Sequence, residues 1–222
     1  MFKEHNYTLW GTYCSCGSEC SILQNLHHPW SDTKFEVKVT CNCCKKELVI
    51  NKDMATEFYD GKILSYFDGI YGDVLDLGCG EGFLSRTLLK ESAVDKIYGL
   101  DIDEQCTDEL KDIINHSNRF KFVKADISSL NEIFSTSSID FLVSRDVFMF
   151  IEDTDKYFED VTRIVRKEIR HMGWYQSFND RMKNNLNPDQ IVEEYSKRGW
   201  STEIEYLDWY KSGYFIRASK NN

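Results

Sequence analysis

The sequence has few prolines and no long apolar run. Only two prolines occur in 222 residues, so no proline-rich linker divides the chain. No stretch approaches the roughly 20 apolar residues that a bilayer-spanning helix needs. The opening segment MFKEHNYTLW also lacks the apolar core of a secretory signal. We therefore expect a protein without membrane segments that stays in the reducing cytoplasm.

The sequence also lacks an excess of positive charge. Its 27 Lys and Arg residues are outnumbered by 37 Asp and Glu residues, which gives a net charge of -10 at pH 7. Proteins that bind a nucleic-acid backbone neutralise phosphates with Lys and Arg, so this charge disfavours a nucleic-acid partner although it does not forbid one. The one basic run, RIVRKEIR at 163–170, is predicted to close an amphipathic helix, where cations complement the helix dipole.

Most of the eight cysteines lie close to the N-terminus. In a reducing compartment such clustering favours metal binding over disulfides. The segment CNCCKK at 41–46 offers a C-x2-C turn between the strand-like runs FEVKVT and ELVI, as in a zinc knuckle. We predict a structural zinc ion bound by Cys14, Cys16, Cys41 and Cys44, with Cys20, Cys43, His27 and His28 as reserve ligands. The alternative is a set of free, partly buried thiols.

The chain changes character near residue 50, which predicts a small β-rich cysteine module at 1–50 and a main domain at 51–222. From residue 72 onward, strand-like and helix-like segments alternate, as in an α/β fold with a mainly parallel sheet. The predicted strands are 73–77, 96–101, 120–126, 139–144, 171–178, 202–209 and 213–219. The last two follow each other without a helix and are expected to form an antiparallel pair at the sheet edge. We predict a Rossmann-like, seven-stranded sheet with helices on both faces.

Helices are predicted from apolar periodicity and from capping residues. One buried face is formed by Cys106, Leu110, Ile113 and Ile114, and another by Tyr157, Phe158, Val161, Ile164 and Val165. A further helix is expected to begin after Asn187, with Pro188 at its first position, and to stop at Gly199. These apolar stripes are interpreted as core.

The segment VLDLGCGEGF at 74–83 places three glycines behind an apolar run that contains an acid, Asp76. Such a turn from strand into helix lets backbone N–H groups approach a ligand closely. In a dinucleotide enzyme a third glycine would stand where Phe83 is found. The spacing therefore disfavours a dehydrogenase.

The string from Asp76 to Gly82 instead resembles the first motif of class I S-adenosylmethionine-dependent methyltransferases. The resemblance continues in order through YGLDID, VKADIS and IDFLVSRDVFMFIED, roughly over residues 70–170. It implies S-adenosyl-L-methionine as cofactor, with Asp76 near its ammonium group and Asp101 on the ribose hydroxyls. It further implies that Ile102 and Ile127 pack on the adenine and that Asp126 accepts a hydrogen bond from the amine of the adenine. The implied cofactor set is Asp76, Gly78, Cys79, Gly80, Gly82, Asp101, Ile102, Asp126, Ile127 and Ser144. Cys79 is interpreted as a small packing residue in this loop.

Methyl transfer from a sulfonium is an in-line displacement that depends mainly on alignment. The loop after the fourth strand is the best place for acceptor contacts, because ligands bind beyond the carboxyl ends of parallel strands. Arg145 and Asp146 lie there, and Asp146 is the candidate base or orienting group. His171 and Tyr175, on the predicted fifth strand, are further candidates for substrate contact, each weighed against a role in the core.

Three hypotheses for the acceptor stay open. The fourth-strand loop reads SRDVF and lacks the Asn/Asp-Pro-Pro-aromatic string of nucleic-acid amino-methyltransferases. A zinc ribbon joined to this domain resembles both ribosomal-RNA guanine methyltransferases and methyltransferases of sugar pathways. The acidic charge favours a small-molecule or sugar-like acceptor. The alternatives are an RNA methyltransferase that docks ribosomal or transfer RNA through the cysteine module, and a non-catalytic adaptor that uses this module to bind a protein partner.

Overall fold

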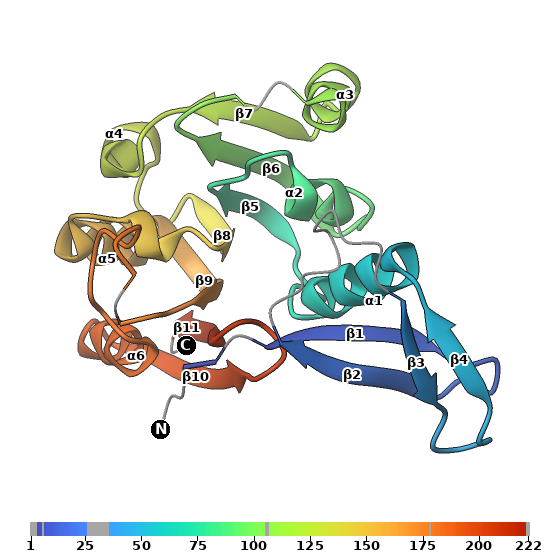
Figure 1. Cartoon of the computed structure of the whole chain (residues 1–222). Coiled ribbons are helices and arrows are strands. Elements are labelled where there is room, and N and C mark those ends of the chain that lie inside the picture. The colour runs from blue at the N-terminus through green and yellow to red at the C-terminus, as the bar shows by residue number, and fades with distance from the viewer. Residues whose placement is uncertain (1–3, 6, 26–35, 105–106, 178, 221–222) are drawn as a thin grey trace. The chain divides into compact units, whose positions relative to one another are not determined.

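The computed structural model describes residues 4–5, 7–25, 36–104, 107–177 and 179–220 (Figure 1). The chain divides into two compact units. The small unit comprises Lys3–Asp68 and Tyr206–Gly213, and the large unit comprises Gly69–Glu205 and Tyr214–Asn222. The predicted division of the chain after residue 50 stays a prediction about folding units. None of the described helices is long and apolar enough to cross a membrane.

The small unit contains two β-hairpins and one helix. Strand β1 (Tyr7–Tyr13) pairs antiparallel with β2 (Glu19–Asn25), and β3 (Val37–Thr40) pairs antiparallel with β4 (Glu47–Ile50). The second hairpin confirms the β-rich reading of the cysteine region. Helix α1 (Lys52–Ser65) begins where the Asn51 side chain accepts a hydrogen bond from the backbone N–H of Met54. His27 and His28 lie outside the described residues.

The large unit is built on a seven-stranded sheet with the order β10-β11-β9-β8-β5-β6-β7. Its strands are β5 (Gly72–Leu77), β6 (Val94–Asp101), β7 (Phe120–Lys124), β8 (Ile139–Arg145), β9 (Val165–Trp174), β10 (Trp200–Leu207) and β11 (Gly213–Lys220). Strands β5 to β9 pair in parallel. The connection from β10 to β11 is too short for a parallel crossover, so this pair is antiparallel. The predicted Rossmann-like, mainly parallel sheet is confirmed.

Helices cover both faces of this sheet (Figure 1). Helices α2 and α3 lie on one side, and α4, α5 and α6 lie on the other. Their bounds are α2 (Phe83–Leu88), α3 (Asp108–His116), α4 (Leu130–Ile133), α5 (Thr154–Ile164) and α6 (Pro188–Lys197). Short 3-10 turns, η1 (Ile127–Ser129) and η2 (Phe148–Phe150), follow β7 and β8. Strand β5 therefore lies at the point where the strand order reverses, which is where open α/β sheets bind ligands.

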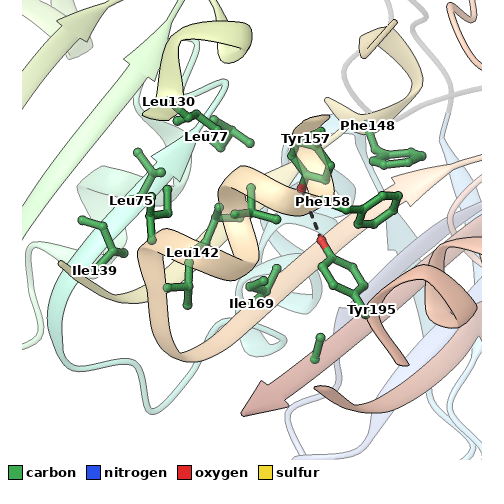
Figure 2. Close-up of a cluster of buried hydrophobic side chains, with 14 of the residues drawn as sticks. Leu75, Leu77, Leu130, Ile139, Leu142, Phe148, Tyr157, Phe158, Ile169 and Tyr195 are labelled. Atoms are coloured by element: carbon green, nitrogen blue, oxygen red, sulfur yellow. Dashed lines mark hydrogen bonds between the residues drawn. The ribbon is translucent and has the colours of Figure 1, made fainter. Parts of the chain in front are cut away.

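The main core lies between the sheet and helices α4, α5 and α6 (Figure 2). Leu75, Leu142 and Ile169 from three strands are fully buried there with Phe158 of α5. Full burial of side chains of this kind contributes about 1.5–3 kcal/mol each. Tyr195 of α6 is also fully buried, and its hydroxyl lies 3.3 Å from the hydroxyl of Tyr157. This packing fixes the strands whose carboxyl ends form the site described below.

The fifth strand begins earlier than predicted. The basic run at 163–170 does not close a helix, because α5 ends at Ile164 and β9 begins at Val165. Two charged residues of the run face an acid on the neighbouring strand: Arg166 Nε lies 2.6 Å from Asp140 Oδ1, and Lys167 Nζ lies 2.8 Å from it. This non-local pairing, together with the burial of Val165, stabilises the strand against the local helical pattern.

The other helix predictions agree better with the structure. Asn187 caps α6, and its side chain and that of Gln190 exchange hydrogen bonds with each other's backbone N–H groups. Leu110 and Ile113 are buried on α3, whereas Cys106 lies outside the described residues.

Candidate functional site

A cavity of about 720 Å³ lies at the carboxyl ends of β5 to β8. Each of these strands contributes residues at or just after its end. The predicted site residues that line this cavity are Gly78, Asp101, Ile102, Asp126, Ile127, Arg145 and Asp146. Side chains that are far apart in the sequence thus meet because parallel strands end at one edge of the sheet.

The glycine loop between β5 and α2 has a left-handed backbone. The φ angles are 69° at Gly78, 50° at Gly80 and 78° at Gly82, a region that glycine enters without steric cost. A Cβ atom on Gly78 would collide with Val147, whereas one on Gly80 would have no heavy atom within 4 Å. The loop thus packs on the protein at Gly78 and leaves space beside Gly80.

Asp76 lies below this loop and outside the cavity lining. It is 2% exposed, and its Oδ2 accepts hydrogen bonds from the Ser85 backbone N–H at 3.1 Å and from the Ser85 hydroxyl at 2.6 Å. Burial raises the pKa of Asp76 to about 6. The carboxyl therefore links β5 to α2, and its implied contact with a ligand ammonium stays a prediction.

Two further acids stand at the ends of β6 and β7. Asp101 Oδ2 accepts a hydrogen bond from the Gly80 N–H at 2.8 Å. Asp126 is exposed and accepts one from the Ser128 N–H at 2.8 Å, and its hydrogen bonds with Ser128 lower its pKa. Ile102, which is 61% exposed, and the half-buried Ile127 lie next to these acids in the sequence. Carboxylates combined with exposed apolar side chains suit a nucleoside, which offers hydroxyls and a flat base.

Arg145 and Asp146 form the wall of the cavity at the end of β8. The Arg145 guanidinium lies 4.4 Å from the centre of the Phe83 ring, and its Nε lies 3.9 Å from Asp146 Oδ2. Asp146 has a φ of 59°, and its N–H donates to the carbonyl of Met172 at 3.0 Å. A non-glycine residue in this backbone region is costly and is often found at functional sites.

Other predicted site residues do not line the cavity. Ser144 is 1% exposed within β8, and Cys79 is buried. Burial raises the pKa of the Cys79 thiol, which makes it a poor nucleophile. The position of Cys79 agrees with a packing role.

His171 is fully buried and does not line the cavity. Burial lowers its pKa to about 3, and its Nε2 lies 3.3 Å from the Tyr214 hydroxyl. Within the described part of the chain, His171 Nδ1 has no hydrogen-bond partner. Tyr175 packs against the main core. A catalytic role for His171 stays a prediction, and its ring has no access to the cavity in this structure.

Several residues of the cavity wall are not predicted from the sequence. The cavity is also lined by Phe150, Glu152, Lys156 and Tyr157. The apolar periodicity assigns Tyr157 to the core alone. Asn184, which belongs to a distant segment, donates from its Nδ2 to the carbonyls of Phe148 at 2.8 Å and Ile151 at 2.9 Å. No local pattern marks Asn184, because its partners lie more than thirty residues earlier in the chain.

The small unit contains a cluster of four thiols. The Sγ atoms of Cys14, Cys16, Cys41 and Cys44 all lie within 4.8 Å of one another. Cys14 and Cys44 are 3.5 Å apart, and Cys16 and Cys41 are 3.6 Å apart. Tetrahedral zinc with bonds of 2.3 Å places its sulfur ligands about 3.8 Å apart. The cluster therefore has the spacing and ligand type that a zinc ion needs.

The remaining two N-terminal cysteines are not part of this group. Cys20 is buried, its Sγ lies 3.7 Å from the Ser18 carbonyl, and burial raises its pKa to about 11. Cys43 is exposed. The structure thus gathers the four preferred cysteines and leaves these two reserve residues outside.

Comparisons with known proteins find similarity to methyltransferases. The family described as "Methyltransferase domain" matches residues 75–170. The chain is 30% identical over 117 residues to malonyl-[acyl-carrier protein] O-methyltransferase of Chlorobium phaeovibrioides, covering 52% of this chain and 44% of that protein. It is 27% identical over 112 residues to ribosomal RNA small subunit methyltransferase A of Mycoplasma mobile, covering 49% of this chain and 43% of that protein. The matches thus span less than half of either curated relative.

Solved structures show the same fold at low sequence identity. A SAM-dependent methyltransferase from Aquifex aeolicus has a TM-score of 0.56 and 17% identity, over 72% of this chain and 88% of that one. Phosphoethanolamine N-methyltransferase 2 of Haemonchus contortus, in complex with S-adenosyl-L-methionine, has a TM-score of 0.60 and 19% identity, over 73% of this chain and 52% of that one. Residues 75–170 therefore resemble a methyltransferase domain, and they lie within a Rossmann-like fold.

Proposed function

We propose that this protein is an S-adenosylmethionine-dependent methyltransferase that transfers a methyl group to a small-molecule or sugar-like acceptor. One observation carries the proposal: the cavity of about 720 Å³ joins the glycine loop to the acids and isoleucines at the ends of β6 and β7. Its volume falls within the range of small-molecule sites. The cofactor supplies a methyl group that its sulfonium already activates.

The residues of the cavity match the groups of this cofactor. Both Asp101 and Asp126 line the cavity. Asp101 would accept hydrogen bonds from the ribose hydroxyls, and Asp126 would accept one from the amine of the adenine. Ile102 and Ile127 offer apolar surface to the base. The open space beside Gly80 lets the methionyl part pass close to the backbone. The acids at this site suit a cation and would repel the pyrophosphate of a dinucleotide.

Arg145 and Asp146 are the candidates for acceptor contacts. Both line the cavity beside the glycine loop, and their charges are opposite. Arg145 can orient an anionic or polar acceptor, and Asp146 can accept a proton from an acceptor that must lose one. Alignment of acceptor and methyl group would supply most of the rate.

The charge of the cavity favours a small acceptor. Five carboxylates line it against two cations, Arg145 and Lys156; the acids are Asp101, Asp126, Asp146, Glu152 and Asp153. This surplus of negative charge opposes the entry of a polyphosphate chain. RNA is the second candidate, because the Mycoplasma mobile relative is a ribosomal RNA methyltransferase.

The four-cysteine cluster is proposed to hold a structural zinc ion. Four thiolates close the coordination sphere and leave no open position, which is typical of structural sites. Cys14 and Cys16 follow β1, while Cys41 and Cys44 lie between β3 and β4. The ion would therefore join two hairpins that also share a small buried cluster with Trp10 of β1, Val37 of β3 and Ile50 of β4.

Isothermal titration calorimetry with S-adenosylhomocysteine tests the proposed cofactor site. The wild type should bind, and Asp101→Asn should bind at least about tenfold more weakly, because a charge-assisted hydrogen bond contributes about 1.5–3 kcal/mol. Asp103→Asn is the matched control, since Asp103 is exposed and pairs with Lys124. Absence of binding by the wild type would reject the cofactor assignment.

The acceptor class needs a separate measurement. Labelled ribosomal and transfer RNA should not be retained by the protein at moderate salt if the acceptor is small. Retention together with methyl transfer to the RNA would replace the first candidate by the second. Cofactor binding without methyl transfer to any acceptor class would favour a non-catalytic adaptor.

A further inference from the structure

A second, smaller cavity of the large unit lies at the other ends of the sheet strands. It measures about 340 Å³ and is lined by Tyr71, Phe141, Lys167, Glu168, Arg170 and Lys220, together with Gly69. Tyr71 precedes β5, Lys167 lies near the start of β9, and Lys220 ends β11. This cavity lies at the amino ends of the parallel strands, whereas the candidate methyl-transfer cavity lies at their carboxyl ends.

Positive charge exceeds negative charge around this cavity. Asp140 is paired with two cations. Arg166 donates from Nε to Oδ1 and from Nη2 to Oδ2 of Asp140, each at 2.6 Å, and Lys167 Nζ lies 2.8 Å from Asp140 Oδ1. Glu168 is likewise paired with two cations, Arg170 at 2.5 Å and Arg217 at 3.4 Å. Asp140 and Glu168 therefore each have two cationic partners, and one of these, Arg217, also lies 3.6 Å from Glu203.

Lys220 adds a fifth cation to the same group. Its ammonium lies 5.9 Å from the centre of the Trp200 ring, and no carboxylate in the described part of the chain forms an ion pair with it. Three of these cations, Lys167, Arg170 and Lys220, line the cavity itself against one carboxylate, Glu168, in a chain whose net charge is -10. Such a local surplus is costly without a bound anion, because like charges repel at short range.

Aromatic and acidic neighbours hold two of these cations in place. The Arg170 side chain is 7% exposed, is bound through Nε to Glu168, and has its guanidinium 6.0 Å from the centre of the Phe141 ring. Lys167 Nζ lies 4.0 Å from the centre of the Tyr71 ring. A partly buried arginine that is already oriented loses little freedom when it binds an anion. The exposed Lys220 can complete the site from its rim.

We propose that this second cavity binds the phosphate group of a small phosphorylated ligand. Phosphate offers several acceptor oxygens to the guanidinium and the ammonium groups at once. The phenol of Tyr71, which is 45% exposed, can donate a further hydrogen bond or contact the organic part of the ligand. A volume of about 340 Å³ suits a phosphate or diphosphate with a small substituent.

This ligand is distinct from the methyl acceptor. Phe141 lines the second cavity and Arg145 lines the first, and both belong to β8. Four residues of extended strand span about 13 Å, at about 3.3 Å per residue. A phosphate bound at the second cavity therefore acts as an effector or an anchor away from the reacting atoms. The proposal does not depend on the methyl-transfer activity.

Direct binding of inorganic pyrophosphate to the full chain tests this proposal, with calorimetry as the readout. The wild type should bind, and Lys167→Gln combined with Lys220→Gln should weaken binding at least tenfold. Lys121→Gln, at an exposed position on β7, is the matched control and should bind like the wild type. Lys220→Glu alone, which leaves the pairs of Asp140 intact, should also weaken binding.

Three outcomes would overturn the proposal. They are absence of pyrophosphate binding by the wild type, unchanged binding by the double variant, and binding of a single-stranded RNA oligonucleotide in place of pyrophosphate. Binding of S-adenosylhomocysteine by every variant serves as the folding control. The proposed site for S-adenosylhomocysteine lies at the carboxyl ends of the strands. A variant that loses pyrophosphate binding but still binds S-adenosylhomocysteine therefore tests this proposal separately from the proposed methyl transfer.

Discussion

The backbone N–H of Gly80 donates a hydrogen bond of 2.8 Å to the side chain of Asp101. This contact joins the loop after β5 to the end of β6, so the glycine loop and the first acid of the cavity are fixed relative to each other. Asp101 Oδ2 thus binds the glycine loop, while its Oδ1 accepts a longer hydrogen bond of 3.5 Å from the Asp103 N–H, and the residue lines the cavity.

Substitution of Gly80 should separate folding from binding. Gly80→Ala places a Cβ in the space beside the loop and keeps a left-handed backbone, which costs an L-residue about 1–2 kcal/mol. We expect a folded protein with slightly lower stability and much weaker binding of S-adenosylhomocysteine. Gly61→Ala, at an exposed helical position of α1 with open space around it, should bind normally and gain stability. Equal affinity of the two variants would argue against a ligand beside Gly80.

Substitution within the cysteine cluster should remove the metal. Cys41→Ser replaces a buried thiol whose Sγ lies 3.6 Å from that of Cys16, and it should lower the zinc content per chain and the melting temperature. Cys43→Ser, at an exposed cysteine outside the cluster, is the control and should retain zinc. Elemental analysis with thermal unfolding in the presence and absence of a chelator gives the readout. A wild-type protein purified without zinc, and unaffected by added zinc, would contradict the assignment.

The burial of His171 should make stability depend on pH. Burial lowers the pKa of His171 from 6.5 to about 3. Between these two pH values the His171 side chain is protonated in the unfolded chain and neutral in the folded chain. This contribution to stability is complete above about pH 6.5 and is lost as the pH falls towards 3. Between pH 7 and pH 5 the loss should be about 2 kcal/mol.

Two histidine variants isolate this effect in urea unfolding at pH 7 and pH 5. His171→Phe keeps an aromatic ring against Phe148 and should remove the loss of stability that His171 causes between pH 7 and pH 5. His116→Gln, at an exposed position on α3, should leave it unchanged. The same pH dependence in the wild type and in His171→Phe would show that another group is responsible.

Asn184 should stabilise the turn that forms part of the cavity wall. Asn184→Ala leaves the carbonyls of Phe148 and Ile151 without their side-chain donor, which costs about 1–3 kcal/mol if they stay dry. Hydrogen exchange at residues 148–151 should become faster, since η2 would open more often. Asn131→Ala, at an exposed position on α4, is the control. Unchanged exchange in Asn184→Ala would mean that the core alone holds the turn.

Much of the fold and of the candidate site could be predicted from local sequence. Asn187 and Pro188 start a helix through their own backbone and side-chain chemistry, and the structure places α6 there. Asp101, Asp126 and Arg145 come at or directly after strand-like runs, and strand ends meet at one edge of a parallel sheet. The early start of β9 could not be predicted, because Arg166 and Lys167 are paired with Asp140 of another strand.

The sequence by itself determined the order of strands and helices, the glycine loop, and the residues that are proposed to bind a sulfonium nucleoside or a zinc ion. These features depend on neighbours within a few positions, where backbone preference and spacing act directly. Only the tertiary structure decided that His171 is buried, that Asp76 binds Ser85, and that a second, cationic cavity forms between β8, β9 and β11. The reason is physical: burial, pKa and cavity shape are set by atoms from distant segments, which come together only when the chain folds.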